Sequence, residues 1–104
     1  MGDRVSISFK HGTEESPVLF NHWEGMGFVQ LAKDYVIDLK KVLATRKSKG
    51  TYPLDRLEPG TVMVDFIRHI TEDMDRVDSN LYLGKTEADG DNSDNGHFTI
   101  DLGK

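Results

Sequence analysis

Residues 26–46 read MGFVQLAKDYVIDLKKVLATR and decide the fold class. Apolar residues recur in this stretch at intervals of three and four positions, which is the spacing of one face of an α-helix. The apolar stripe consists of Phe28, Leu31, Ala32, Tyr35, Leu39, Val42 and Leu43. Polar and charged residues occupy the other faces. The pattern therefore predicts an amphipathic helix from about Met26 to about Arg46.

A second helix is predicted to open near Glu58 and Pro59, because proline is tolerated in the first turn of a helix. Its buried stripe consists of Met63, Phe66, Ile67, Ile70 and Met74. Residues 61–64 are mostly β-branched and would also suit a strand. The three- and four-residue spacing through Met74 favours the helix.

Strands are predicted on both sides of the two helices. Val5, Ile7 and Phe9 alternate with polar residues, as in a half-exposed strand, and a second strand follows the turn-forming residues 11–17 at residues 18–22. Two more strands are predicted at residues 80–86 and 97–102. Leu81 and Leu83 share one face of the first of these strands. In the second, Phe98, Ile100 and Leu102 are expected to point inward.

The order of the elements is therefore strand, strand, helix, helix, strand, strand. Strands with one apolar face suit an antiparallel sheet, so we expect an α+β fold in which about four strands carry both helices on one face. Each pair of strands is close in the sequence, and two hairpins are the simplest pairing. A length of 104 residues with 37% hydrophobic residues fits a single domain, residues 1–104, with one core.

Composition excludes several classes of protein. The chain has no cysteine, which excludes disulfides, thiolate metal sites and a cysteine nucleophile and is compatible with the cytoplasm. No apolar run is long enough to span a membrane. The net charge of -5 repels nucleic acid. One basic cluster stands out, formed by Lys40, Lys41, Arg46, Lys47 and Lys49, but it lacks exposed aromatic residues, so we expect no nucleic-acid partner.

A candidate ligand site lies in residues 21–27, between the second strand and the first helix. The glycines there allow close approach of a ligand, and the amides of a first helical turn attract anions. The candidate ligand-binding residues are His22, Trp23, Glu24 and Gly25. His22 and Glu24 are also of the type that binds metals. In the alternative interpretation, the glycines only turn the chain and Trp23 seals the end of the sheet.

The late loop, residues 89–96, holds a second candidate site. Asp91, Ser93 and Asn95 are spaced by two and followed by Gly96, as in the first half of an EF-hand calcium loop. Leu102 stands where that loop needs a glutamate. The candidate metal ligands are Asp89, Asp91, Ser93, Asp94 and Asn95, and the expected ion is calcium, because their oxygen atoms suit a hard cation. The alternative is a polar hairpin loop without an ion.

Two pairs in the second predicted helix are spaced by four residues: Asp65 with His69, and Arg68 with Glu72. An aspartate that orients an imidazole is half of a general-base arrangement. Because no nucleophile is marked nearby, surface ion pairs are the preferred interpretation.

Three short stretches resemble a group of small uncharacterised prokaryotic and phage-associated proteins. The stretches here are Met1-Gly2-Asp3-Arg4-Val5, His22-Trp23-Glu24-Gly25-Met26 and Asp91-Asn92-Ser93-Asp94-Asn95-Gly96. The group has Met-Gly-Asn-Arg-Ala, His-Trp-Asn-Gly-Gly and Asp-Asn-Gly-Asp-Asn-Gly at these places. The resemblance implies a shared architecture without an activity, and it implies that the His-Trp turn and the late loop belong to one feature.

The sequence as a whole favours a small soluble module that binds a ligand, an ion or a protein, as a monomer or a small homo-oligomer. The alternative is a metal-assisted hydrolase or phosphoesterase that uses His22, Asp91, Asp94 and Glu24. That alternative requires the histidine and the carboxylates to converge around an open coordination position. A homo-oligomeric structural protein is the third class, and it would have an exposed apolar face or a sheet edge paired between chains.

Overall fold

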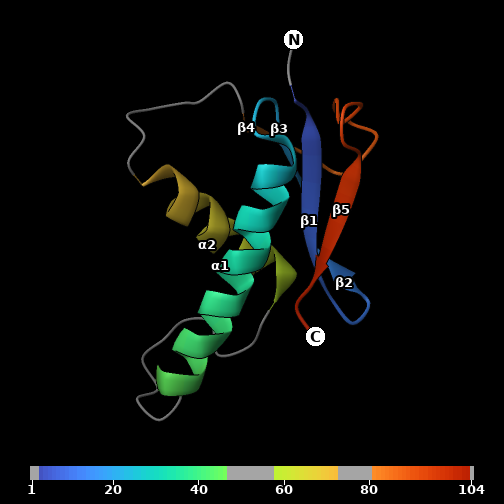
Figure 1. Cartoon of the computed structure of the whole chain (residues 1–104). Coiled ribbons are helices and arrows are strands. Elements are labelled where there is room, and N and C mark those ends of the chain that lie inside the picture. Colours follow the sequence, from blue (N-terminus) through green and yellow to red (C-terminus); the bar gives the residue numbers. More distant parts are fainter. Residues whose placement is uncertain (1–2, 47–57, 73–80, 104) are drawn as a thin grey trace.

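The computed structural model describes residues 3–46, 58–72 and 81–103 and has a five-stranded sheet with two helices (Figure 1). Its elements are β1 (Val5–His11), β2 (Glu14–Glu15), β3 (Val18–Asn21), α1 (Gly25–Arg46), α2 (Pro59–Thr71), β4 (Leu81–Gly84) and β5 (His97–Asp101). The predicted α+β fold is therefore confirmed. Predictions for Met74, Lys47 and Lys49 fall outside the described residues.

The sheet is built around β1. Strands β2 and β3 pair antiparallel with β1, and β4 pairs antiparallel with β3. β5 pairs with β1 in parallel, from Ser6 opposite His97 to Lys10 opposite Asp101. The predicted hairpin between the last two strands is therefore wrong, because β4 and β5 lie on opposite sides of the β1–β3 pair. Residues 85–96 connect them by crossing the sheet (Figure 1).

The core lies between the sheet and the two helices. Val5, Ile7 and Phe9 on β1 are fully buried, as the alternation predicts. The buried residues of α1 are Phe28, Val29, Ala32, Tyr35, Val36 and Leu39, and those of α2 are Pro59, Val62, Met63 and Phe66. Leu31, predicted as core, is 37% exposed. The face of α1 that meets the sheet is rotated toward Val29 and Val36, which leaves Leu31 at its margin.

The opposite face of the sheet is also covered, which the sequence does not predict. Ser6 and Ser8 point to this face, yet both are completely buried. Residues of the crossing segment 85–96 lie over them: Asn92 Nδ2 donates a hydrogen bond to Ser6 Oγ at 2.8 Å. A Cβ atom at Gly90 would lie 2.6 Å from a ring carbon of Tyr82. Glycine at this position therefore allows the segment to pack closely on the sheet.

Neither of the two described helices is both long enough and apolar enough to cross a bilayer.

Candidate functional site

Three segments that are far apart in the sequence meet at one end of the sheet. β1 begins there, β3 ends there, and β5 begins there, because β3 is antiparallel and β5 parallel to β1. Asp3 connects all three segments. Its backbone N–H donates to His22 O at 2.8 Å, its backbone oxygen accepts from Gly25 N at 2.9 Å, and its Oδ1 accepts from Asn95 Nδ2 at 2.6 Å. We call residues 3–4, 22–26 and 91–95 the sheet-end surface.

The turn between β3 and α1 is held by the buried side chain of Asn21. Its Oδ1 accepts hydrogen bonds from the backbone N–H groups of Trp23 and Glu24, both at 2.9 Å. Its Nδ2 donates to Glu24 Oε1, also at 2.9 Å. Asn21 is only 1% exposed, so these bonds are shielded from water. The side chain therefore fixes the backbone that carries Trp23.

Trp23 itself projects into solvent. The residue is 51% exposed, so about half of its surface is available to a partner. The His22 ring packs edge-on against the indole, with ring centroids 4.6 Å apart and planes at 72°. Met26, on the first turn of α1, is 48% exposed. The sheet-end surface thus presents two large apolar side chains on a hydrogen-bonded turn.

Gly25 marks the start of α1 and has a φ of +53°, a conformation that favours glycine. A Cβ atom at this position would overlap the Asp3 carboxylate. The carboxylate of the chain itself therefore lies beside the helix start, where the sequence predicts that an external anion could bind. A second anion there would meet a like charge, which disfavours its binding.

Arg4 provides a cation for the late loop. Its Nε lies 3.2 Å from Asp91 Oδ2, and its Nη1 lies 3.5 Å from Asp94 Oδ2. The backbone N–H of Arg4 also donates to Asp94 Oδ2 at 2.9 Å. Hydrogen bonds from the side chain and backbone of Ser93 lower the pKa of Asp91, and the charges of Arg4 and His22 lower it further. The repulsion between these carboxylates is thus offset by a guanidinium of the same chain.

The predicted metal ligands are divided among different partners. Asp89 Oδ2 accepts from the backbone N–H groups of Lys85 and Thr86 at 2.7 and 2.9 Å and closes the turn after β4. Asp91 and Asp94 contact Arg4, and Asn95 binds Asp3. Among the described residues, no group of three His, Asp or Glu side chains could hold a metal ion. Calcium binding stays a prediction, and so does the metal-assisted hydrolase.

A chain of hydrogen bonds between side chains of β1, β2 and β5 is not predicted by the sequence. Ser8 Oγ donates to Glu15 Oε2 at 2.5 Å, so its only proton is used and it must accept from His97 Nε2, which lies 3.2 Å away. His97 Nδ1 then accepts from Ser6 Oγ at 2.8 Å. Ser6 and Ser8 are completely buried, so this chain of bonds joins β2 and β5 to β1 in a region shielded from water. Its members are recognisable only once β5 is known to pair with β1.

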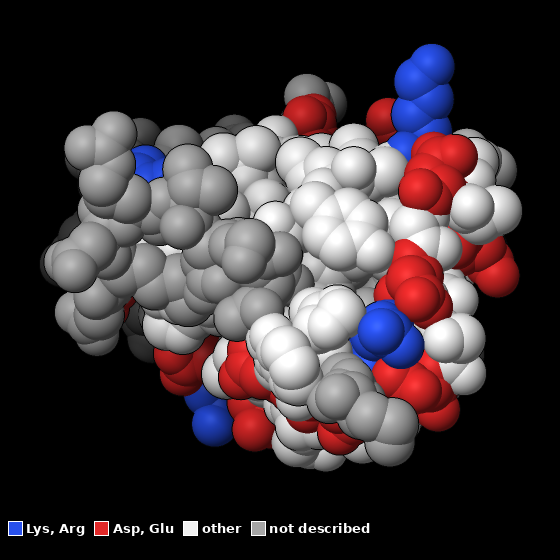
Figure 2. Space-filling view, turned by 90° about the horizontal axis from the view of Figure 1, so that it is seen from above, with Lys and Arg blue, Asp and Glu red and all other residues white. Residues whose placement is uncertain are grey.

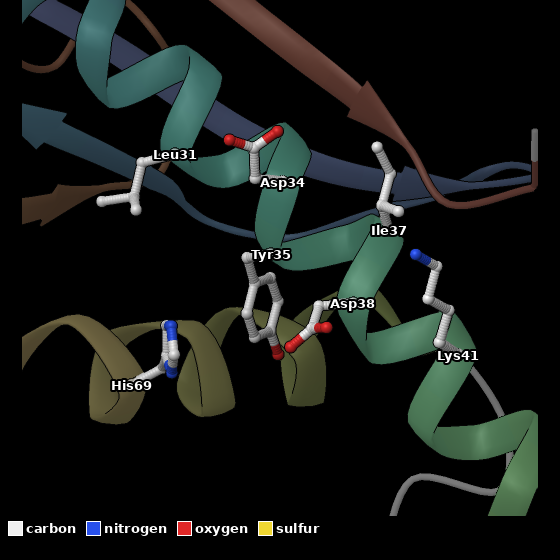
Figure 3. Close-up of a pocket in the computed structure, with 7 residues that line it drawn as sticks. All are labelled: Leu31, Asp34, Tyr35, Ile37, Asp38, Lys41 and His69. Atoms are coloured by element: carbon white, nitrogen blue, oxygen red, sulfur yellow. The ribbon is translucent and has the colours of Figure 1, made fainter.

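A shallow pocket of about 380 Å³ lies between α1 and α2 (Figure 3). Figure 3 shows Tyr35 and Asp38 reaching from α1 toward α2, where His69 lies. Asp65 does not orient His69, as a general-base pair requires, but accepts a hydrogen bond from Tyr35 Oη at 2.5 Å. The His69 ring instead packs on Tyr35, with centroids 5.6 Å apart. These contacts join the two helices.

Comparisons with protein families, curated proteins and solved structures found no match to this chain. Function is therefore inferred from the geometry of the site. The sheet-end surface combines exposed apolar side chains with carboxylates on a fixed backbone, and its Asp91 and Asp94 carboxylates are already paired.

Proposed function

We propose that this protein is a cytoplasmic binding module that recognises a protein segment through the sheet-end surface, with Trp23 as the central contact. The observation that carries the proposal is the 51% exposed indole on a turn that Asn21 holds by three hydrogen bonds. Tryptophan is enriched among the residues that dominate binding energy at protein interfaces. Met26 extends the apolar area along the first turn of α1.

Pre-organisation supports the same conclusion. Binding normally costs free energy because loops and side chains must be ordered at the interface. Asn21 already fixes the backbone of Trp23 and Glu24, and Asp3 fixes Gly25 relative to β1. A partner that binds here therefore loses little affinity to ordering of the turn.

The chemistry of the surrounding side chains favours binding over catalysis. Ser6 and Ser8, which have a histidine within hydrogen-bond distance, are completely buried. The carboxylates of Asp91 and Asp94 both contact Arg4, so a catalytic cation would have to displace the guanidinium. Neither the buried serines nor the paired carboxylates are placed to attack a substrate at the sheet-end surface.

Selection from a library of random peptides displayed on phage tests the proposal. The native protein is the bait, and the selected peptides are then measured against Trp23→Ala and Val64→Ala. Val64 is 59% exposed on α2, where it lines a pocket with Glu14 of β2, so its truncation is a matched control. We expect peptides that bind the native protein and Val64→Ala equally, and Trp23→Ala about tenfold more weakly or worse.

Trp23→Ala should keep the amide NMR spectrum of the folded protein, because the indole is half exposed and is not a member of the buried core cluster. Selected peptides that bind Trp23→Ala as tightly as the native protein would overturn the proposal. So would a selection that yields no peptide dependent on Trp23.

A further inference from the structure

We infer that the recognised segment is basic and places an arginine side chain on the Trp23 indole, with its guanidinium directed to the carboxylate of Glu24. This inference rests on the proposed function and names the chemistry of the partner. It is carried by the exposed indole together with the charge of the side chains around it.

The sheet-end surface is strongly acidic. It contains Asp3, Glu24, Asp91 and Asp94, against the single cation Arg4. Figure 2 looks down on this end of the molecule and shows acidic residues gathered beside an uncharged area, with one basic residue between two acidic ones. A cationic segment would gain from this field both on approach and once bound. A nucleic acid or an anionic lipid surface would be repelled.

Glu24 is the carboxylate best placed for a partner. It follows Trp23 directly and is exposed. Its Oε1 accepts from Asn21 Nδ2, which fixes the direction of the side chain. Within the part of the chain that the structure describes, its Oε2 has no hydrogen-bond partner. One oxygen thus orients the carboxylate, and the other is the acceptor that we assign to the partner's guanidinium.

Arginine fits this pair of residues better than lysine. Its planar guanidinium stacks on an indole face and still donates hydrogen bonds in its own plane to a carboxylate. Lysine has a compact, strongly hydrated ammonium that gains less from stacking. The protein already holds one guanidinium in this acidic region, since Arg4 contacts Asp91 and Asp94 at 3.2 and 3.5 Å.

The probe is a short capped peptide with one arginine in a glycine–serine background. Its analogues carry citrulline, lysine or glutamate in place of the arginine. Citrulline keeps the planar shape of the guanidinium without its charge. Trp23 is the single tryptophan of the chain, so its fluorescence and its indole N–H signal in NMR report binding at this site directly.

We expect the arginine peptide to shift the Trp23 signals, and the citrulline peptide to bind about tenfold more weakly. The lysine peptide should fall between them, and the glutamate peptide should not bind. Higher salt should weaken the arginine peptide, because part of its binding is the attraction of exposed charges.

Glu24→Gln should weaken the arginine peptide about threefold to tenfold and leave the citrulline peptide unchanged. Asp34→Asn is the matched control, since Asp34 is an exposed carboxylate on α1 that lines the α1–α2 pocket, and it should have no effect. Equal affinities for the arginine and citrulline peptides would overturn the inference, as would chemical-shift changes that map away from Trp23.

The peptide library separates the two proposals. Trp23-dependent peptides that lack basic residues would leave the binding module in place and refute the arginine inference. A library without Trp23-dependent peptides would refute both.

Discussion

Replacing Phe66 by alanine should lower the free energy of unfolding by about 3–5 kcal/mol. Phe66 is completely buried on α2 and contacts three aromatic rings from other elements. Its ring centroid lies 5.5 Å from that of Phe9 on β1 and 5.8 Å and 5.0 Å from those of Phe28 and Tyr35 on α1. Through this one side chain, α2 packs on both the sheet and α1.

The magnitude has two parts. Burial of the phenyl ring away from water stabilises the folded state by about 2–3 kcal/mol, and the alanine variant loses this contribution. A residual cavity of roughly 50–80 Å³ adds about 1–2 kcal/mol, because the surrounding rings collapse only partly. Because a domain of this size is stable by only about 5–15 kcal/mol, Phe66→Leu, with an expected loss of about 1–2 kcal/mol, provides a milder second variant.

Urea unfolding followed by circular dichroism measures these losses. With a slope of about 1–3 kcal/mol per molar urea, Phe66→Ala should move the midpoint to clearly lower urea. Val64→Ala on the same helix is the control, because Val64 is 59% exposed and should change stability by about 0.5 kcal/mol or less. A loss below about 1 kcal/mol for Phe66→Ala, or an equal loss for Val64→Ala, would refute the packing of α2 on the sheet and on α1 through Phe66.

Three further predictions concern the late loop and the crossing segment. Hydrogen bonds from Ser93 hold the pKa of Asp91 below its ordinary value of 3.8, so the stability that Asp91 contributes is complete above about pH 4 and is lost as the pH falls through the lowered pKa. Ser93→Ala should raise that pKa toward 3.8, and carboxyl NMR titration would contradict this if the pKa did not move. Gly90→Ala should lower the free energy of unfolding in urea by about 1–3 kcal/mol, because its methyl group would press on two aromatic rings. Gly27→Ala, in open space on a helix, should raise it by about 0.5–1 kcal/mol. Equal effects of the two variants would contradict the packing of the crossing segment on the sheet. Millimolar calcium should shift the amide signals of the late loop more in Arg4→Gln than in the native protein, and equal shifts would show that the guanidinium does not occupy the place of a cation.

The helices and the inward face of β1 are predictable because their signals are local. The spacing in residues 26–46 and the alternation of Val5, Ile7 and Phe9 depend only on the period of the element itself. The burial of Val29 and Val36 instead of Leu31 depends on the angle at which α1 meets the sheet. That angle is set by tertiary packing, which the sequence of a single helix does not specify.

The pairing of β5 lies beyond local signals for the same reason. Strands that follow each other in the sequence commonly pair, so sequence proximity favours pairing β4 with β5. The crossing is instead stabilised by contacts with distant residues, such as Asn92 with Ser6 and Asn95 with the backbone oxygen of Arg4. Each partner is an ordinary polar residue when the sequence is inspected alone.

In the candidate site too, some residues can be predicted from local sequence and others cannot. His22, Trp23 and Glu24 are recognisable because they lie between a predicted strand and a predicted helix. The roles of Asn21, Asp3 and Arg4 depend on hydrogen bonds and ion pairs that cannot be predicted from the sequence alone. The spacing of the late carboxylates suggests an external cation, but the fold brings Arg4 to Asp91 and Asp94 from the first strand of the sheet.

The sheet-end surface therefore exists only in the folded domain. Asn21 can hold the Trp23 turn locally, but Gly25 adopts its position against Asp3, and Asp3 in turn is held by Asn95 at the start of β5. Opening the β1–β5 pair would release the late loop from Arg4 and separate Asp91 and Asp94 from the rest of the sheet-end surface. Because a partner would bind the folded state alone, its binding must also stabilise the domain, by an amount that grows with its concentration relative to its dissociation constant. The proposed recognition at Trp23 would thus be linked to the pairing of the parallel strand β5 through Asp3 and Arg4.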